Sequence, residues 1–140
     1  DEKYREENQP DVLKLASKYF REMTVGRYTD VLLEDNDQIF IKSNRGELVS
    51  ADEELSAGTK NQLYLSLRFA FISYLDRDRE KLPIMLDEVF SNWDSERLEP
   101  TLGLINEIAK ERQVILFTCK EDNLRHYENY LSQIQKIIIS

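Results

Sequence analysis

The chain has few of the residues that build several common kinds of site. Its 140 residues include one cysteine, one histidine, four glycines and three prolines. Cys119 cannot form an internal disulfide, and a Cys/His zinc site is excluded because cysteines and histidines do not cluster. A single cysteine fits a reducing compartment such as the cytoplasm. We also expect Cys119 to be a buried small residue, because no histidine stands beside it to make it a nucleophile.

Long apolar runs and a surplus of positive charge are also missing. No stretch of 18 apolar residues exists, so we expect no membrane span. Nineteen Lys and Arg against 27 Asp and Glu leave a net charge of −8. That balance argues against a general binder of nucleic-acid backbones, although it does not exclude a local basic patch. Segment 1–8 is charged, so it is no signal peptide. It is expected to be a frayed tail or the end of a longer helix. The missing start methionine suggests a fragment.

Periodicity predicts a mixed fold of the α/β class. Helical spacing of apolar residues predicts a helix over 9–23, and turn signals separate three short strands of an antiparallel meander at 29–34, 38–43 and 46–50. Segment 58–75 is apolar on nearly every side, so we expect a helix buried on most faces. A parallel sheet with flanking helices should follow. Its expected strands are 82–88, 113–118 and 136–140, and its helices 95–111 and 121–133. Pro100 predicts a late start or a distorted first turn for the first of these helices.

Two stretches carry candidate chemistry. Asp87 and Glu88 follow one predicted strand and Thr118–Lys120 follow the next, and function gathers at the carboxyl ends of parallel strands. Two adjacent acids suit a magnesium ion and an activated water. Alternatively, the acids simply mark the point where a strand meets solvent. The turn with Ser56 and Gly58 could bind an anion at a helix N-terminus, but taken alone it is better explained as a helix cap.

The order of the motifs resembles a known family. "LSAGTKNQ", a buried helix, "LPIMLDE", "FSNWD" and "QVILFTCK" follow one another as in the C-terminal lobe of an ABC-type ATPase head. The resemblance covers roughly residues 12–140. It is closest to the SMC-like branch, the coiled-coil ATPases of chromosome maintenance and DNA repair, and to bacterial AAA-type ATPases of the YhaN kind.

The resemblance implies a role for each matching position. Leu55, Ser56, Ala57 and Gly58 would form the signature turn, in which Ser56 and Gly58 contact the γ-phosphate of ATP bound on the opposite head. Asp87 would be the Walker B aspartate, which supports Mg²⁺ through water, and Glu88 the catalytic glutamate. The D-loop at the dimer interface would comprise Ser91, Asn92, Trp93 and Asp94.

Two departures from the family pattern matter. None of the four glycines lies in a G-x-x-x-x-G-K-[ST] loop, so Walker A is missing and the chain should not bind ATP well alone. The family resemblance therefore implies half of a head, with residues 9–140 as the C-terminal lobe and 1–8 as the end of a coiled coil. Lys120 stands where the family has its switch histidine. Lysine can contact a γ-phosphate, but it cannot shuttle a proton at neutral pH as histidine can.

The resemblance implies an ATP-binding and ATP-hydrolysing head that needs an N-terminal Walker A lobe, Mg²⁺ and a second copy of the head. A role in DNA repair or chromosome maintenance would follow, with DNA and a nuclease subunit as further partners. One alternative is a nucleotide-dependent clamp or structural tether without hydrolysis, which Lys120 favours. Another is an accessory lobe that recruits a partner through its acidic surface.

Overall fold

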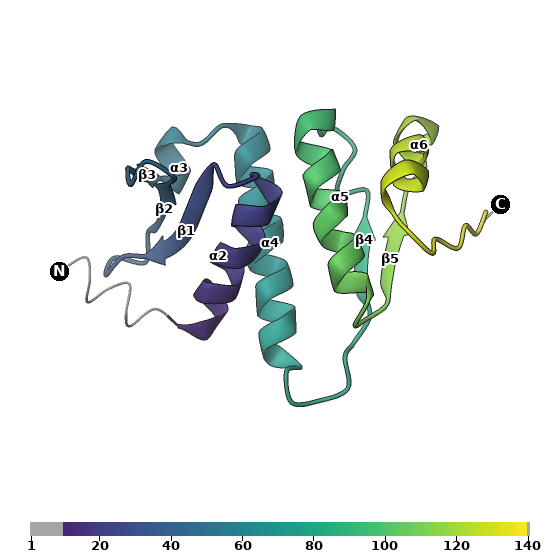
Figure 1. Cartoon of the computed structure of the whole chain (residues 1–140), viewed down its shortest axis with the longest axis horizontal. Helices are drawn as coiled ribbons and strands as arrows, with labels where there is room; N and C mark the ends of the chain where they lie inside the picture. Colours follow the sequence, from purple (N-terminus) through teal and green to yellow (C-terminus); the bar gives the residue numbers. More distant parts are fainter. Residues whose placement is uncertain (1–9, 140) are drawn as a thin grey trace. The chain divides into compact units, whose positions relative to one another are not determined.

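The structure, a computed structural model, describes residues 10–139. Segment 1–8, expected to be a tail or the end of a coiled coil, lies outside the described residues, as do Gln9 and Ser140. The chain divides into two compact units, Asp1–Lys81 and Leu82–Ser140, which we describe one at a time (Figure 1).

The first unit combines a meander with helices. Helix α2 (Asp11–Met23) packs against strand β1 and helix α4. The meander runs antiparallel in the order β1-β2-β3. Its strands are β1 (Tyr28–Leu33), β2 (Ile39–Ser43) and β3 (Leu48–Ser50). A four-residue helix, α3 (Ala51–Glu54), leads into α4 (Ala57–Leu75). The meander and both long helices confirm the sequence prediction, whereas α3 was not predicted.

Turn chemistry fixes the first unit's connections. Helix α2 ends in a Schellman turn, in which the Gly26 N–H donates to the Arg21 carbonyl at 2.8 Å and the Val25 N–H to the Glu22 carbonyl at 3.2 Å. Val25 has a φ of 53°, a region that β-branched residues rarely adopt. Gly46, at φ 83°, turns the chain between β2 and β3.

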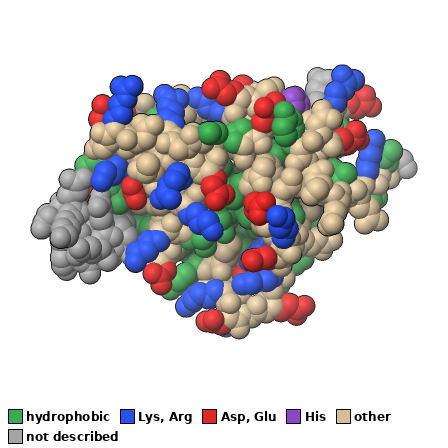
Figure 2. Space-filling view, viewed as in Figure 1, with side chains coloured by type: hydrophobic (Ala, Val, Ile, Leu, Met, Phe, Trp, Pro, Cys, Tyr) green, Lys and Arg blue, Asp and Glu red, His purple; other side chains and the backbone are tan. Residues whose placement is uncertain are grey.

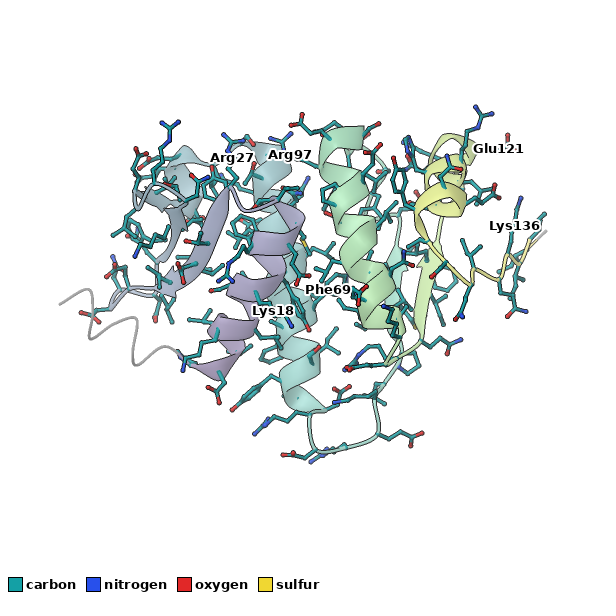
Figure 3. The ribbon with its side chains drawn as sticks, viewed as in Figure 1. Lys18, Arg27, Phe69, Arg97, Glu121 and Lys136 are labelled. Carbon is teal, nitrogen blue, oxygen red and sulfur yellow. The ribbon has the colours of Figure 1, made fainter. Side chains whose placement is uncertain are left out.

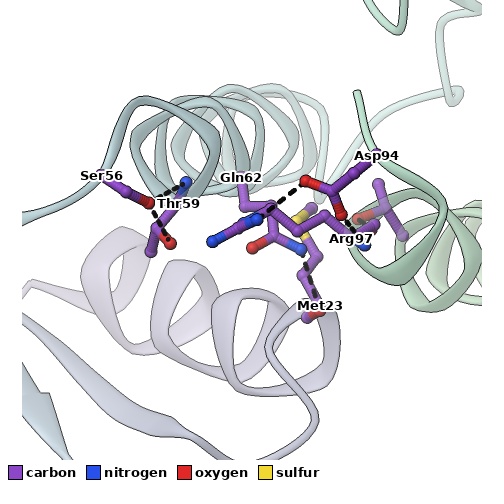
Figure 4. A network of polar contacts seen from close by, with 7 residues as sticks. Met23, Ser56, Thr59, Gln62, Asp94 and Arg97 are labelled. Carbon is purple, nitrogen blue, oxygen red and sulfur yellow. Dashed lines mark hydrogen bonds and ion pairs between the residues drawn. The ribbon is translucent and has the colours of Figure 1, made fainter. Parts of the chain in front are cut away.

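Apolar burial and two polar contacts stabilise this unit. Its main cluster of buried residues comprises Leu13, Phe20, Tyr28, Val31, Ile41, Ala51, Leu55 and Leu63. The Ser17 hydroxyl oxygen accepts from the Val31 N–H at 2.8 Å, which ties α2 to β1. The Gln62 side-chain amide donates to the Met23 carbonyl at 3.0 Å, which ties α4 to the end of α2 (Figure 4). Both polar side chains are buried and hydrogen-bonded, as such groups must be.

Helix α4 is less buried than its composition predicts. Leu63, Leu65, Phe69 and Ala70 are buried, but Tyr64, Phe71 and Leu75 are each more than half exposed. The expectation of burial on most faces is therefore wrong for this chain. The helix is apolar all round, yet the elements described cover only part of its surface.

The second unit is built on a parallel β-α-β unit. Strands β4 (Ile84–Asp87) and β5 (Val114–Phe117) pair in parallel, and α5 (Ser95–Ala109) connects them. Helix α6 (Glu121–Tyr130) follows and packs against α5. In Figure 3, Arg97 marks α5 and Glu121 marks the start of α6. The parallel pair with flanking helices confirms the predicted α/β class.

Helix α5 begins before its proline, so the prediction of a late start at Pro100 is wrong. Asp94 caps the helix, and its carboxylate accepts from the Arg97 N–H at 2.9 Å. Pro100 lies inside the helix, where it removes one backbone donor and its ring crowds the carbonyl of Glu96. The helix continues past it, with Leu98 and Leu102 buried.

The predicted closing strand is absent from the described residues. Segment 136–139 has no regular secondary structure, and Ile137, Ile138 and Ile139 are 74–81% exposed. A strand exists only when a neighbour accepts its backbone hydrogen bonds, and β4 and β5 pair only with each other. A β-branched apolar run alone does not supply that neighbour.

No described helix combines the length and the apolar character that a membrane span requires. On the face that Figure 2 shows, acidic and basic side chains are interspersed.

Candidate functional site

The turn that precedes α4 has a buried residue at its start and exposed residues after it. Leu55 is buried in the core cluster, whereas Ser56 and Ala57 are exposed. Ser56 is the N-cap, and its hydroxyl oxygen accepts from the Thr59 N–H at 3.2 Å (Figure 4). The Ser56 hydroxyl also donates to the Thr59 hydroxyl oxygen at 3.0 Å. The turn is thus a well-formed helix cap, and the first helical amides, at Ala57 and Gly58, point where an anion would bind.

Lys60 takes part in holding this turn. Its ammonium group donates to the Asp52 carbonyl at 2.8 Å, which ties α4 to the short helix α3. The ammonium group of Lys60 therefore has a structural partner in this chain. Gly58 lies in the first turn of α4 and has helical conformation, so the turn does not require the backbone freedom of glycine here. What Gly58 contributes to the turn is therefore its small size.

Asp87 and Glu88 end β4 beside the end of β5. Asp87 is exposed and pairs in register with Phe117, the last residue of β5. The Glu88 N–H donates to the Phe117 carbonyl at 3.0 Å, so the backbone pairing continues one residue past the strand. Glu88 has a φ of 54°, in the left-handed region that non-glycine residues seldom occupy. This conformation bends the chain sharply where its carboxylate is presented.

The side chain of Glu88 is bonded to the loop after β5. Its Oε1 accepts a hydrogen bond from the Cys119 N–H. Asp87, Glu88 and the Thr118–Lys120 loop are thus brought to one edge of the sheet, as the sequence predicts. Cys119 is exposed, so the expectation that it is a buried small residue is wrong. Its backbone, rather than its thiol, makes the contact.

Lys120 lies beside the segment Ser91–Asp94. Its ammonium group donates to the Ser91 carbonyl at 3.4 Å, and its N–H donates to the Thr118 hydroxyl oxygen at 3.2 Å. The cation therefore lies at the same edge of the sheet as Glu88. The sequence indicated proximity of these loops, but it held no signal for the contact with Ser91.

The segment that follows Glu88 is a compact turn. The Ser91 N–H donates to the Glu88 carbonyl at 3.4 Å, and the Trp93 N–H donates to the Phe90 carbonyl at 3.3 Å. Phe90 is buried, and the half-buried Trp93 ring meets it edge-on with the centroids 4.9 Å apart. Asn92 is exposed between them. The turn thus presents polar groups outward from an aromatic anchor.

Asp94 closes this turn as the cap of α5. Its carboxylate accepts from the Arg97 N–H and forms an ion pair with the Arg97 guanidinium at 2.8 Å (Figure 4). The backbone N–H of Arg97, followed by its side chain, lowers the pKa of Asp94 below 3.8. Asp94 therefore has a local structural role whether or not a second molecule binds here.

Sequence analysis missed two residues of α6 that contact the same turn. The Asn123 side-chain amide donates to the Phe90 carbonyl at 3.1 Å. Tyr127, one helical turn later, is 4% exposed, and its ring lies 6.2 Å from that of Phe90. Burial, followed by the charge of Glu88, raises the pKa of Tyr127 to about 12. The available signal was their i, i+4 spacing directly after the switch position.

The donor set fits a magnesium ion that is shared with a substrate. No group of three or more His, Cys, Asp or Glu residues is placed to hold a metal within the described part of the chain. Asp87 and Glu88 are adjacent at the strand end, and Mg²⁺ is usually bound by one or two carboxylates together with waters and substrate phosphates. These residues therefore suit a metal that arrives with a phosphate ligand.

Comparison with known proteins finds similarity in sequence and in fold. No protein-family model matches the chain. The chain is 34% identical over 121 residues to the uncharacterized protein YhaN of Bacillus subtilis, a match that covers 86% of the chain but 12% of that protein. The chain thus spans about an eighth of the length of this relative.

Solved structures resemble the chain in fold. The SMC head domain from Thermotoga maritima matches with a TM-score of 0.64 and 24% identity, over 85% of this chain and 41% of that one. An SMC ATPase from work on ATP-driven dimerization and DNA stimulated activation matches with a TM-score of 0.63 and 20% identity, over 79% of this chain and 68% of that one. The chain therefore has the fold of part of an SMC head domain.

Proposed function

We propose that this chain is half of a head that binds and hydrolyses ATP as a dimer formed around the nucleotide. The observation that carries the proposal is the bond between Glu88 and Cys119, which brings a strained acidic residue and the switch loop together at the end of a parallel sheet. The fold adds support, since one structure with this fold comes from work on ATP-driven dimerization of SMC ATPases. The Walker A loop would come from the N-terminal lobe of the same protein.

Glu88 is assigned to the attacking water. Its Oε1 is bonded to Cys119, so Oε2 is the oxygen that we assign to orienting the water and accepting its proton. Asp87, exposed on the adjacent position, would hold Mg²⁺ through a water. Mg²⁺ bound with ATP supplies charge neutralisation at the phosphates. Lys120 would place a positive charge close to the γ-phosphate, as a catalytic group that stabilises charge but does not relay a proton.

Ser56, Ala57 and Gly58 are assigned to the ATP of the opposite head. The N-terminus of α4 offers amide donors and a partial positive charge to a phosphate. The hydroxyl hydrogen of Ser56, which now points to Thr59, would turn toward the phosphate, while its oxygen continues to cap the helix. Leu55 contributes by burial, since its side chain holds the turn in the core.

Ser91, Asn92, Trp93 and Asp94 are assigned to the contact between heads. They form the outward turn after Glu88, so a second head that binds there would act directly on the segment that carries the catalytic carboxylate. The resemblance of the motifs to coiled-coil ATPases of chromosome maintenance and DNA repair extends the proposal to a cytoplasmic role in those processes, with DNA and a nuclease subunit as further partners.

The test of the ATP-bridged dimer is Ser56→Arg in the complete two-lobed protein. An arginine at this exposed N-cap would fill the space for the phosphate and remove the cap acceptor. We expect ATP-dependent dimerisation, measured by light scattering, to be lost. Asn44→Arg adds the same charge at an exposed turn of the meander and should leave dimerisation intact. Unchanged dimerisation of Ser56→Arg would contradict the proposed ATP-bridged dimer.

A second candidate function is a nucleotide-dependent clamp without turnover. Lys120 favours it, because an ammonium group bonded to the Ser91 carbonyl cannot relay a proton at neutral pH. In that case the complete protein would dimerise with ATP but would not hydrolyse it. Lys120→His would then introduce turnover, whereas in an active ATPase the same change would alter a rate that already exists.

A further inference from the structure

The turn that carries Glu88 is held from outside by α6. The Phe90 carbonyl accepts two hydrogen bonds, from the Trp93 N–H at 3.3 Å within the turn and from the Asn123 side chain at 3.1 Å. The Asn123 bond connects positions 33 residues apart. The Asn123 bond therefore fixes the turn relative to α6, whereas the Trp93 bond only shapes the turn itself.

Tyr127 supports the same contact from one helical turn further along. Its ring is buried against Phe90, which is 1% exposed and also meets Trp93. The Tyr127 ring thus packs against the same residue whose carbonyl accepts from Asn123. Asn123 and Tyr127 together form a polar and an aromatic contact with one residue, two positions after Glu88.

This position matters because the backbone of Glu88 has a strained conformation. A non-glycine residue at φ 54° is strained, and such a conformation persists only where the surroundings hold it. The Cys119 N–H holds the carboxylate, while the backbone that follows is held through Phe90. Freedom of that backbone would let Glu88 relax out of the left-handed region.

We propose that Asn123, supported by the buried ring of Tyr127, is a positioning residue for Glu88 and for the turn Ser91–Asp94. Asn123 acts through the Phe90 carbonyl and does not touch nucleotide. This inference rests on the proposed ATPase function. It predicts that α6, which begins directly after Lys120, couples the switch position to the turn that meets the second head.

The test measures ATP turnover, in the presence of Mg²⁺, by the complete two-lobed protein and by its Asn123→Ala and Asn123→Asp variants. The aspartate has the shape of asparagine but no N–H donor for Phe90. We expect both variants to lower kcat about 10- to 100-fold with KM nearly unchanged, because misplacement of a catalytic group slows chemistry rather than binding. Asn129→Ala removes an exposed asparagine from the same helix and should leave both constants unchanged.

Tyr127 provides a second, independent variant pair. Tyr127→Phe keeps the ring against Phe90 and should retain most of the turnover. Tyr127→Leu removes the aromatic contact and should lower kcat in the same way as Asn123→Ala. The urea unfolding midpoint of each variant separates a loss of position from a loss of fold.

The outcomes separate this inference from the function on which it rests. If Glu88→Gln abolishes turnover but Asn123→Ala retains kcat within about twofold, the inference is overturned and the ATPase function stands. A fall in kcat that follows only the loss of folded protein, or that comes with an equal rise in KM, also overturns it. If the parent shows no turnover that depends on Glu88, the proposed function fails and the inference fails with it.

Discussion

Oε1 of Glu88 accepts a hydrogen bond from the backbone N–H of Cys119, the residue directly before Lys120. The bond joins the end of β4 to the loop after β5, across 31 positions of the sequence. A change at Lys120 can therefore reach the carboxylate through one intermediate residue, Cys119. This gives a physical basis for coupling between the phosphate contact proposed for Lys120 and the water activation proposed for Glu88.

The strained backbone conformation of Val25 should lower the free energy of unfolding. Val25 has a φ of 53° and is 79% exposed, so little packing compensates for its conformation. We expect Val25→Gly to raise the free energy of unfolding by about 1 kcal/mol, measured by urea denaturation. The greater freedom of glycine in the unfolded chain offsets part of the gain. Val25→Ala keeps a Cβ and is the control, and equal stability of the two variants would contradict this account.

Gln62 should contribute to stability through its bond to Met23. The side chain is 3% exposed and donates to the Met23 carbonyl at the end of α2. Gln62→Leu preserves the volume but leaves that carbonyl without this donor, which should cost about 1–3 kcal/mol of unfolding free energy. Gln135→Leu, at an exposed position, should change stability by less than about 0.5 kcal/mol. Equal effects of the two variants would refute the structural role of Gln62.

Asp94 should make stability depend on pH in the acid range. Its folded pKa lies below the ordinary 3.8, so its stabilising effect is present above that value and is lost as the pH falls through the folded pKa. Asp94→Asn keeps a cap acceptor but has no charge. We expect the parent's advantage over Asp94→Asn in urea denaturation at pH 7 to shrink once the pH is below 3.8 and to vanish when the pH has fallen through the folded pKa. A constant difference across this range would argue against the ion pair with Arg97.

The Tyr127 phenol should lose its proton at a higher pH than an ordinary tyrosine does. Its folded pKa of about 12 lies above the ordinary 10.0, so its contribution to stability is complete below pH 10 and is lost as the pH rises toward 12. In a difference titration of tyrosinate absorbance, the parent minus Tyr127→Phe should show a step near pH 12 and none near pH 10. A step near 10 would place the phenol in solvent, against its burial beside Phe90.

Local patterns predicted most of the elements, because those elements depend on local physics. The meander followed from short alternating runs separated by "DND" and "NRG", and the structure pairs them as predicted. Helix α3 was missed because its four residues are mainly acidic and have no apolar period. The prediction of a strand at 136–139 was wrong because strand formation depends on a neighbouring strand, which a local pattern does not reveal.

The candidate site was predictable in position but not in its contacts. Parallel strands place their carboxyl ends together, so the neighbourhood of Glu88 and Lys120 followed from the motif order. The bond from Cys119 and the left-handed conformation of Glu88 depend on the loops that follow each strand, which no periodicity describes. Asn123 was overlooked because a polar residue in a short surface helix usually faces water.

The most direct test of this account is ATP turnover by the complete two-lobed protein, parent beside Glu88→Gln. The variant keeps the shape of the side chain and the acceptor for the Cys119 N–H, but it loses the carboxylate that would take a proton from water. The account predicts measurable turnover in the parent and its loss in Glu88→Gln, with ATP-dependent dimerisation retained. Equal turnover of the two proteins would show that Glu88 is not the catalytic carboxylate and would contradict the account.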